Sequence, residues 1–177
     1  MQRTHAQTIA LDALLVALLV ASCFFTIPLG PVPFTLQTAV VILILLICNP
    51  QQTALICGIY VLMGTVGLPV FSGMSGGIMR ASAGFLFGFI VGGALASALR
   101  MLLNSFNKFP TVVCDAIAAV VYMFIADVLG LIWYTFFAGV TFAEAFFIMV
   151  APFIFVDCLK AVFALVAAKA VRASLHL

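Results

Sequence analysis

The sequence predicts an all-α integral membrane protein with six transmembrane helices, and three observations support this fold class. Hydrophobic residues make up 67% of the 177 residues and charged residues only 7%. Mean hydropathy is +1.39. A transmembrane helix needs about 20 mostly apolar residues, so the chain has room for roughly six of them with short loops. We therefore expect residues 1–177 to form a single transmembrane domain.

The first two expected helices flank a proline-rich loop. The first covers residues 9–27, and three prolines follow between positions 28 and 33. Proline fixes φ and lacks an N–H group, so this loop is expected to be stiff and extended rather than helical. The second helix, 34–47, is short, and residues 49–52 are expected to make a tight turn into the third helix, 53–66.

A glycine-rich loop, residues 67–80, follows the third helix. It is too apolar for an ordinary solvent loop and too rich in glycine and proline for a helix. Non-helical backbone of this kind is tolerated near a membrane where it is buried in protein or lines a cavity. Gly76 and Gly77 permit the positive φ and the close backbone approach that a lid over a ligand would need.

Three more helices complete the expected topology. The fourth, 83–103, carries four glycines on one close-packing face. The fifth covers 111–133, and the loop 134–150 is expected to include a short interfacial helix. The sixth covers 152–172, with a proline in its first turn, where its missing N–H group does no harm.

The distribution of basic residues orients the chain. With the N-terminus in the cytoplasm, the expected cytoplasmic segments contain five basic residues, whereas Arg80 alone is external and Lys160 lies within a helix. This excess follows the positive-inside rule. We therefore expect a multi-pass protein of the plasma or inner membrane with both termini cytoplasmic. The five basic residues are Arg3, Arg100, Lys108, Lys169 and Arg172.

Composition also excludes several functions. No hydrophilic segment is large enough for an ATPase, a nuclease or a sensor, so any energy source must come from another chain. The net charge of +2 is too small to indicate nucleic-acid binding. His5 and His176 lie near the two termini, and the five cysteines form no CxxC pair or Cys/His cluster. We therefore predict no enzyme activity, no metal and no cofactor.

Polar residues gather on the expected external side. Asp157 and Lys160 are three residues apart, so they share a helix face. Charges at membrane depth cost roughly 2.5–3.5 kcal/mol each and usually face a partner or a cavity. The pair therefore either neutralises itself between helices or forms a polar ligand site. With Thr35 and Gln37 after the first loop and Arg80 after the second, the pattern is typical of a small-ligand pocket.

Several of these residues also have structural interpretations. Gln37 could instead bond a neighbouring helix, and Arg80 could extend to the lipid headgroups. Asp127 either pairs with Arg80 or is a buried structural acid. Asp12 and Asp115 are expected near the cytoplasmic face, solvated or paired.

A stripe of small residues marks the first helix. Ala13, Ala17 and Ala21 repeat every four residues and so lie on one face. Such a face lets another helix approach closely in lipid, where packing drives association. The partner is either another membrane protein or a neighbouring helix of the same chain.

Four motifs occur in the order and spacing of a known family: GPVPFTLQT at 30–38, GLPVF at 67–71, Gly76-Gly77, and PFI at 152–154 followed by Asp157 and Lys160. They resemble the BioY family, the biotin-binding membrane subunits (S components) of energy-coupling factor transporters. The resemblance implies an S-component-like bundle that binds biotin, a transported ligand rather than a cofactor, near its external face under lid loops.

The resemblance also implies roles for named residues. Asp157 and Lys160 would belong to the vitamin site. The stripe Ala13, Ala17 and Ala21 would dock the coupling transmembrane protein, and two cytoplasmic ATPases would complete the complex. Whether the subunit acts with that module, alone or as a homo-oligomer stays open.

One segment departs from the family pattern. Family members commonly read GPTGGY, whereas residues 80–85 of this chain read RASAGF. The change places a positive charge at the mouth of the fourth helix, and Arg80 is a hypothetical partner for the carboxylate of the ligand. Two alternatives to biotin uptake stay open: an S component for another small vitamin, or a membrane assembly subunit without a ligand. A proton-coupled transporter using Asp127 and Asp157 is disfavoured because the chain shows no inverted repeat.

Overall fold

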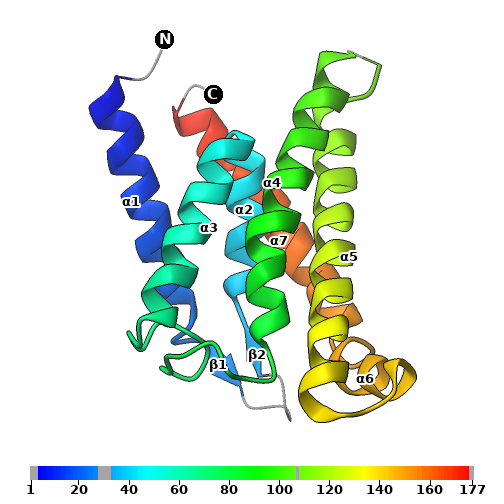
Figure 1. Ribbon diagram of the computed structural model, residues 1–177. Coiled ribbons are helices and arrows are strands. Elements are labelled where there is room, and N and C mark those ends of the chain that lie inside the picture. Colours follow the sequence, from blue (N-terminus) through cyan, green and yellow to red (C-terminus); the bar gives the residue numbers. More distant parts are fainter. Residues whose placement is uncertain (1–3, 28–32, 107, 176–177) are drawn as a thin grey trace.

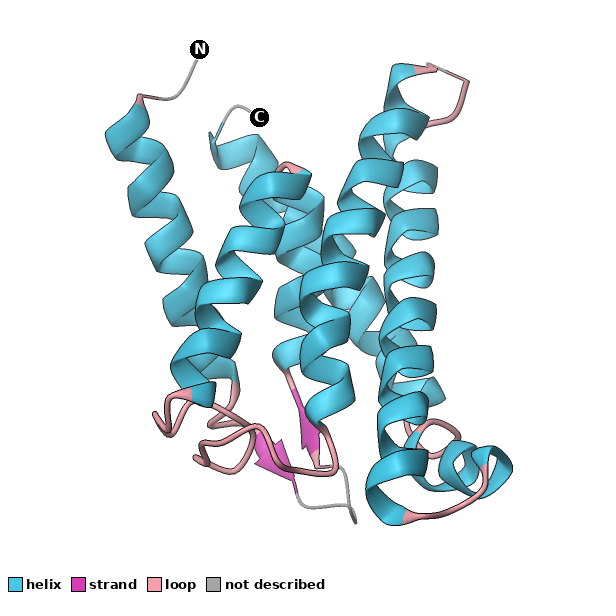
Figure 2. Cartoon of the chain, viewed as in Figure 1, coloured by secondary structure: helices cyan, strands magenta, loops and turns pink. Residues whose placement is uncertain are grey.

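A computed structural model describes residues 4–27, 33–106 and 108–175. These residues form seven helices and one two-stranded sheet, with the helices packed side by side (Figures 1 and 2). The first helix starts at the same end of the bundle at which the last helix finishes, and we call this the terminal end. The sheet, loop 66–82 and a short helix lie at the opposite end, here called the loop end. The elements are α1 His5–Ser22, β1 Thr26–Ile27, β2 Phe34–Thr35, α2 Gln37–Ile47, α3 Pro50–Thr65, α4 Ala83–Ser105, α5 Thr111–Ala138, α6 Phe142–Met149 and α7 Ile154–Leu175.

The six bundle helices differ in length and in how well they could cross a membrane. Helices α1, α4 and α5 are long and apolar enough to span, and α6 with α7 passes the same test as a pair bent by 56°. Helix α3 has 16 residues and α2 only 11, both fewer than the roughly 20 residues that a transmembrane helix needs. Most of α2 is buried and it packs against α1, α3, α4, α5 and α7, so protein rather than lipid surrounds it. The short α2 is therefore an inner helix of the bundle.

The segment after α1 contains a small hairpin that the sequence did not predict. Helix α1 ends at Ser22, and Thr26–Ile27 pairs antiparallel with Phe34–Thr35. The two segments that flank residues 28–32 are extended, and sheet hydrogen bonds join them to each other. Residues 28–32, which contain two of the three prolines, lie outside the described residues. The hairpin places Thr35 two residues before Gln37, the first residue of α2.

Several of the predicted boundaries were wrong, including those of the first helix, which was expected at 9–27 and covers His5–Ser22. Residues 50–52 are the first turn of α3 rather than a separate tight turn, because the Asn49 side chain and that of Gln52 form a capping box. Helix α5 continues to Ala138, five residues past the expected end, and stops at Gly139 with φ 66°. The short helix expected between 134 and 150 is present as α6.

Glycines bring α4 and α5 into close contact, as the glycine face of the fourth expected helix predicted. A Cβ atom added to Gly84 would lie 2.4 Å from the carbonyl oxygen of Leu129. One added to Gly88 would lie 2.7 Å from Cα of Ala126. A larger residue at either position would push the helices apart. This contact sets the position of the α5 turn that carries Asp127.

Candidate functional site

A cavity with about 610 Å³ of empty space lies near the loop end of the bundle. Its wall is formed by β2, by loop 66–82 and by helices α2, α4, α5, α6 and α7. Aromatic and aliphatic side chains and polar side chains line it in about equal numbers. The principal lining residues are Thr35, Gln37, Thr38, Phe71, Ser72, Phe85, Phe89, Asp127, Met149, Phe153 and Asp157.

Asp157 and Lys160 form an ion pair at this cavity. The Lys160 Nζ atom lies 2.8 Å from Oδ1 of Asp157 and 4.2 Å from the ring centroid of Phe34. Lys160 is only 7% exposed and does not line the cavity, whereas Asp157 does. A buried ammonium needs a carboxylate and further contacts to offset its lost hydration. Lys160 therefore supports Asp157 from behind, and Asp157 presents its carboxylate to the cavity.

Gln37 and Thr35 belong to a hydrogen-bonded chain that ties the wall together. The Thr35 hydroxyl donates to Oε1 of Gln37 over 3.3 Å, and Nε2 of Gln37 donates to the hydroxyl of Tyr60. Tyr60 in turn donates to the carbonyl oxygen of Val70 over 2.9 Å. Gln37 thus bonds a neighbouring helix, as its structural interpretation predicted, and it also lines the cavity. Tyr60 connects α3 to the loop above the site.

Arg80 organises loop 66–82 rather than lining the cavity. Its Nη1 donates to Oγ of Ser75 over 2.6 Å, and its Nη2 donates to the carbonyl oxygen of Ser72 over 3.2 Å. The guanidinium lies 5.7 Å from the ring centroid of Phe71, a residue that does line the cavity. Burial lowers the pKa of Arg80. Among the described residues Arg80 makes no ion pair with Asp127, so that predicted pairing was wrong.

Gly76 and Gly77 also act within the loop. Gly77 has φ 88°, the left-handed conformation that its predicted role required, and its N–H donates to the carbonyl oxygen of Gly64 over 2.8 Å. A Cβ atom on Gly76 would lie 2.6 Å from the carbonyl oxygen of Gly67. The close approach predicted for these glycines is therefore to backbone at the end of α3. Neither glycine lines the cavity.

Asp127 is the site residue whose position the sequence left open. It projects from α5 into the same cavity as Asp157. Within the described ranges it makes no hydrogen bond and no ion pair. Sequence reasoning also missed Thr38 and the aromatic residues of the wall. Thr38 follows Gln37 and was visible as a polar residue, whereas an aromatic residue in a cavity wall looks the same in sequence as one in the core.

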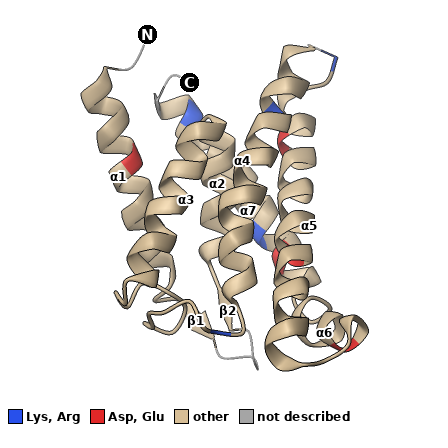
Figure 3. Cartoon of the chain, in the orientation of Figure 1, with Lys and Arg blue, Asp and Glu red and all other residues tan. Residues whose placement is uncertain are grey.

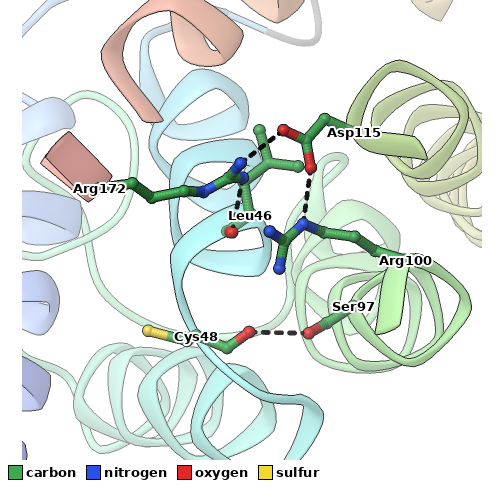
Figure 4. Close-up of polar contacts among 6 residues, drawn as sticks. All are labelled: Leu46, Cys48, Ser97, Arg100, Asp115 and Arg172. Atoms are coloured by element: carbon green, nitrogen blue, oxygen red, sulfur yellow. Dashed lines mark hydrogen bonds and ion pairs between the residues drawn. The ribbon is translucent and has the colours of Figure 1, made fainter. Parts of the chain in front are cut away.

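A second charged cluster lies toward the terminal end, outside the cavity (Figure 4). Asp115 accepts from Nε of Arg100 over 2.6 Å and from Nη1 of Arg172 over 2.7 Å. Arg172 also donates to the carbonyl oxygen of Leu46 over 2.8 Å. These contacts join α2, α4, α5 and α7, and they confirm the expectation that Asp115 is paired. Asp12 accepts a 3.3 Å hydrogen bond from Gln52.

The alanine stripe lies outside the bundle core. Ala13, Ala17 and Ala21 are all exposed, so the alternative that they pack against another helix of the chain was wrong. Ala17 and Ala21 line an apolar groove whose other walls come from α2 and α7. Among the described residues, no other segment packs over these three alanines and buries them.

A membrane helical bundle with a cavity lined by aromatic side chains and fixed polar groups defines a class: a multi-pass membrane protein built to hold a small ligand. The BioY family model matches residues 1–177, and the chain therefore belongs to the BioY family. The family predicted from the sequence motifs is confirmed.

Curated relatives cover nearly the whole chain. The chain is 33% identical to "Biotin transporter BioY2" of Lactococcus lactis subsp. cremoris, over 92% of this chain and 88% of that protein. It is 32% identical to "Biotin transporter BioY" of Thermotoga maritima, over 84% of this chain and 85% of that protein. It is 34% identical to "Probable biotin transporter BioY" of Pyrococcus horikoshii, over 93% and 95%.

A solved structure shares the fold. The crystal structure of the S-component for biotin from an ECF-type ABC transporter superposes with a TM-score of 0.86 at 23% sequence identity. The match covers 97% of this chain and 95% of that chain. The predicted fold class, an all-α membrane bundle like that of S components, is therefore confirmed.

Proposed function

We propose that this protein is the biotin-binding membrane subunit of an ATP-driven uptake system. The observation that carries the proposal is the cavity at the loop end, where Asp157 presents a carboxylate held by Lys160 among aromatic side chains. The named relatives, biotin transporters, support biotin as the ligand.

The chemistry of biotin suits this cavity. Biotin has an apolar body with a cyclic urea at one end and a carboxylate at the other. Asp157 accepts from a urea N–H group, and the ion pair with Lys160 holds the Asp157 carboxylate in place. Thr35 and Gln37 supply further polar contacts, while the phenyl rings of the wall pack against the apolar body. Such a charge-assisted contact beside aromatic side chains favours tight binding.

Loop 66–82 acts as a lid in this proposal. Arg80 holds the loop through Ser72 and Ser75, and the loop carries Phe71 into the cavity wall. Gly76 and Gly77 allow the loop to pack on the end of α3. The lid would close the external mouth of the site, and both termini would be cytoplasmic, as the basic residues predict.

The exposed alanine stripe is the proposed docking face. Ala13, Ala17 and Ala21 would contact an energy-coupling transmembrane protein, which two cytoplasmic ATPases would drive. The proposed activity is binding and translocation without chemical change of the ligand. Replacing Ala17 by leucine should leave biotin binding unchanged and abolish uptake driven by the module. Uptake unchanged in that variant would point to transport without the module, by the subunit alone or as a homo-oligomer.

Titration of the purified, detergent-solubilised protein with biotin tests the proposal directly. Calorimetry should show tight binding at one biotin per chain, and Asp157→Asn should abolish it. Asp12→Asn, a carboxylate outside the cavity, is the matched control and should bind as the parent does. A folded parent protein that does not bind biotin would overturn the proposal. A competition panel of other small vitamins would then separate a different ligand from a subunit without one.

A further inference from the structure

A second, smaller cavity of about 290 Å³ adjoins the ligand cavity. The two share five lining residues, including Thr38, Asp127 and Asp157. The smaller one adds Tyr122, Met123 and Ala126 of α5. Tyr122 precedes Asp127 by five residues, about 7.5 Å along a helix, in the direction of the terminal end. We call this extension the inner chamber, and it leads from the ligand cavity toward the middle of the bundle.

The hydroxyl of Tyr122 in this chamber has no partner. Tyr122 is 0% exposed, and its oxygen makes no hydrogen bond to any residue that the structure describes. A buried hydroxyl is normally satisfied because burial removes its hydration without compensation. Phenylalanine would fill the same space without this cost. An unpaired donor beside a cavity is therefore a candidate contact for a bound molecule.

The chamber also holds more carboxylates than cations. From α7 come Asp157 and Lys160, which pair with each other. From α5 come Asp127 and Tyr122, whereas α4 contributes phenylalanines and α2 contributes Thr38. Arg80 is engaged by its own loop. Asp127 is thus an acceptor for which the described part of the chain supplies no donor.

We propose that Asp127 and Tyr122 complete the recognition of the urea end of the ligand in the inner chamber. This inference rests on the proposed function. A cyclic urea has two N–H groups that diverge on either side of its carbonyl, so one carboxylate cannot accept from both. Asp157 on α7 accepts from one N–H, and Asp127 on α5 accepts from the other. The Tyr122 hydroxyl donates to the carbonyl oxygen, which lies between the two N–H groups.

The test compares two ligands and two variants in calorimetric titrations of the full-length, detergent-solubilised protein. The ligands are biotin and 2-iminobiotin, whose cyclic guanidine carries a positive charge when protonated. Asp127→Asn should weaken biotin binding at least 10-fold and weaken binding of the protonated analogue a further 10-fold, because only the analogue loses a charge pair. A structural role for Asp127 would weaken both ligands equally and would overturn the proposal.

Tyr122→Phe gives an independent readout. It should weaken biotin binding about 10-fold while leaving the thermal midpoint of the ligand-free protein unchanged or higher, since it removes an unpaired buried hydroxyl. Tyr134→Phe makes the same chemical change on the same helix outside both cavities and should not affect binding. Parent-like biotin affinity in Tyr122→Phe would overturn the role of the hydroxyl.

The two proposals fail in different ways. A folded parent protein that binds neither ligand overturns the proposed function, and this inference with it. A parent that binds biotin tightly, with Asp127→Asn and Tyr122→Phe indistinguishable from it, overturns this inference alone.

Discussion

Two clusters of charged residues lie at different levels of the bundle. They differ in whether every carboxylate has a hydrogen-bond donor. Figure 3 shows acidic and basic positions on α4 and α5 near the terminal end, and again on α5 and α7 nearer the loop end. In the first cluster one carboxylate, Asp115, serves two guanidinium groups, and both of its oxygens accept. In the second, Asp127 and Asp157 both line the ligand cavity, and one ammonium, that of Lys160, pairs with Asp157 from outside it.

The difference separates a structural role from a binding role. The Asp115 cluster joins four helices and lies outside the ligand cavity. Both oxygens of its carboxylate accept from guanidinium groups, and Nε of Arg172 is its one buried atom without a partner among the described residues. The cluster around Asp157 keeps an acceptor and a tyrosine hydroxyl without partners in the described part of the chain. Unpaired polar groups are costly unless a ligand completes them. The first cluster should therefore govern stability, and the second should govern ligand affinity.

The largest expected effect is at Asp115. Asp115→Ala leaves the partly buried Arg100 and Arg172 without their shared carboxylate, which should cost about 3 kcal/mol of folding stability. Thermal denaturation in detergent should show a large fall in the midpoint, with the surviving folded fraction binding biotin normally. Lys108→Ala, an exposed change in the α4–α5 turn, should leave the midpoint nearly unchanged. A stable Asp115→Ala protein would contradict the structural role.

The converse effect is expected at the ligand cavity. Asp157→Asn and Lys160→Ala should each weaken biotin binding about 100-fold or more, equivalent to about 2.8 kcal/mol, because the charged acceptor is lost or left without support. The thermal midpoint of the ligand-free protein should change much less than in Asp115→Ala. If both variants bound biotin normally but unfolded at a lower temperature, the Asp157 cluster would have a structural role like that of the Asp115 cluster. That result would contradict the proposed difference between the two clusters.

Arg80 adds a third case to the comparison, because its charged side chain holds loop 66–82 in place. Arg80→Ala should weaken biotin binding about 10-fold by releasing the loop that carries Phe71 into the wall. Since its terminal nitrogens are engaged by Ser72 and Ser75, the loss should be similar for biotin and for its neutral amide analogue. A selective loss for biotin would instead support direct contact between Arg80 and the ligand carboxylate. Binding as tight as the parent's would remove Arg80 from the site.

The smallest expected effect is again at the terminal end. Ser97 donates a 2.9 Å hydrogen bond to the carbonyl oxygen of Cys48, linking α4 to the end of α2 (Figure 4). Ser97→Ala should cost about 1 kcal/mol of stability, the usual net value of one neutral hydrogen bond with a modest penalty for the carbonyl left behind. Biotin titration should show no change. A loss of affinity would mean that the two ends of the bundle are coupled.

Some of the misplaced boundaries could have been found in the sequence. Asn49 followed by Pro50 and by Gln52 is a helix-start signal, with a cap, a proline at the first turn and a reciprocal side chain. Interpreting these residues as a turn moved the start of α3 by three positions. The hairpin of β1 and β2 carried a weaker signal, since two-residue strands have too few positions to show alternation.

The sequence by itself determined the membrane class, the order of the helices and the pairing of Asp157 with Lys160. These depend on local properties: apolar run length, proline and glycine between runs, and a three-residue spacing on one helix face. Only the tertiary structure decided which acid does what. Asp115 and Asp127 lie on the same helix and are the same residue type, yet one meets two arginines and the other meets a cavity. That difference comes from neighbours on other helices, which no local pattern encodes.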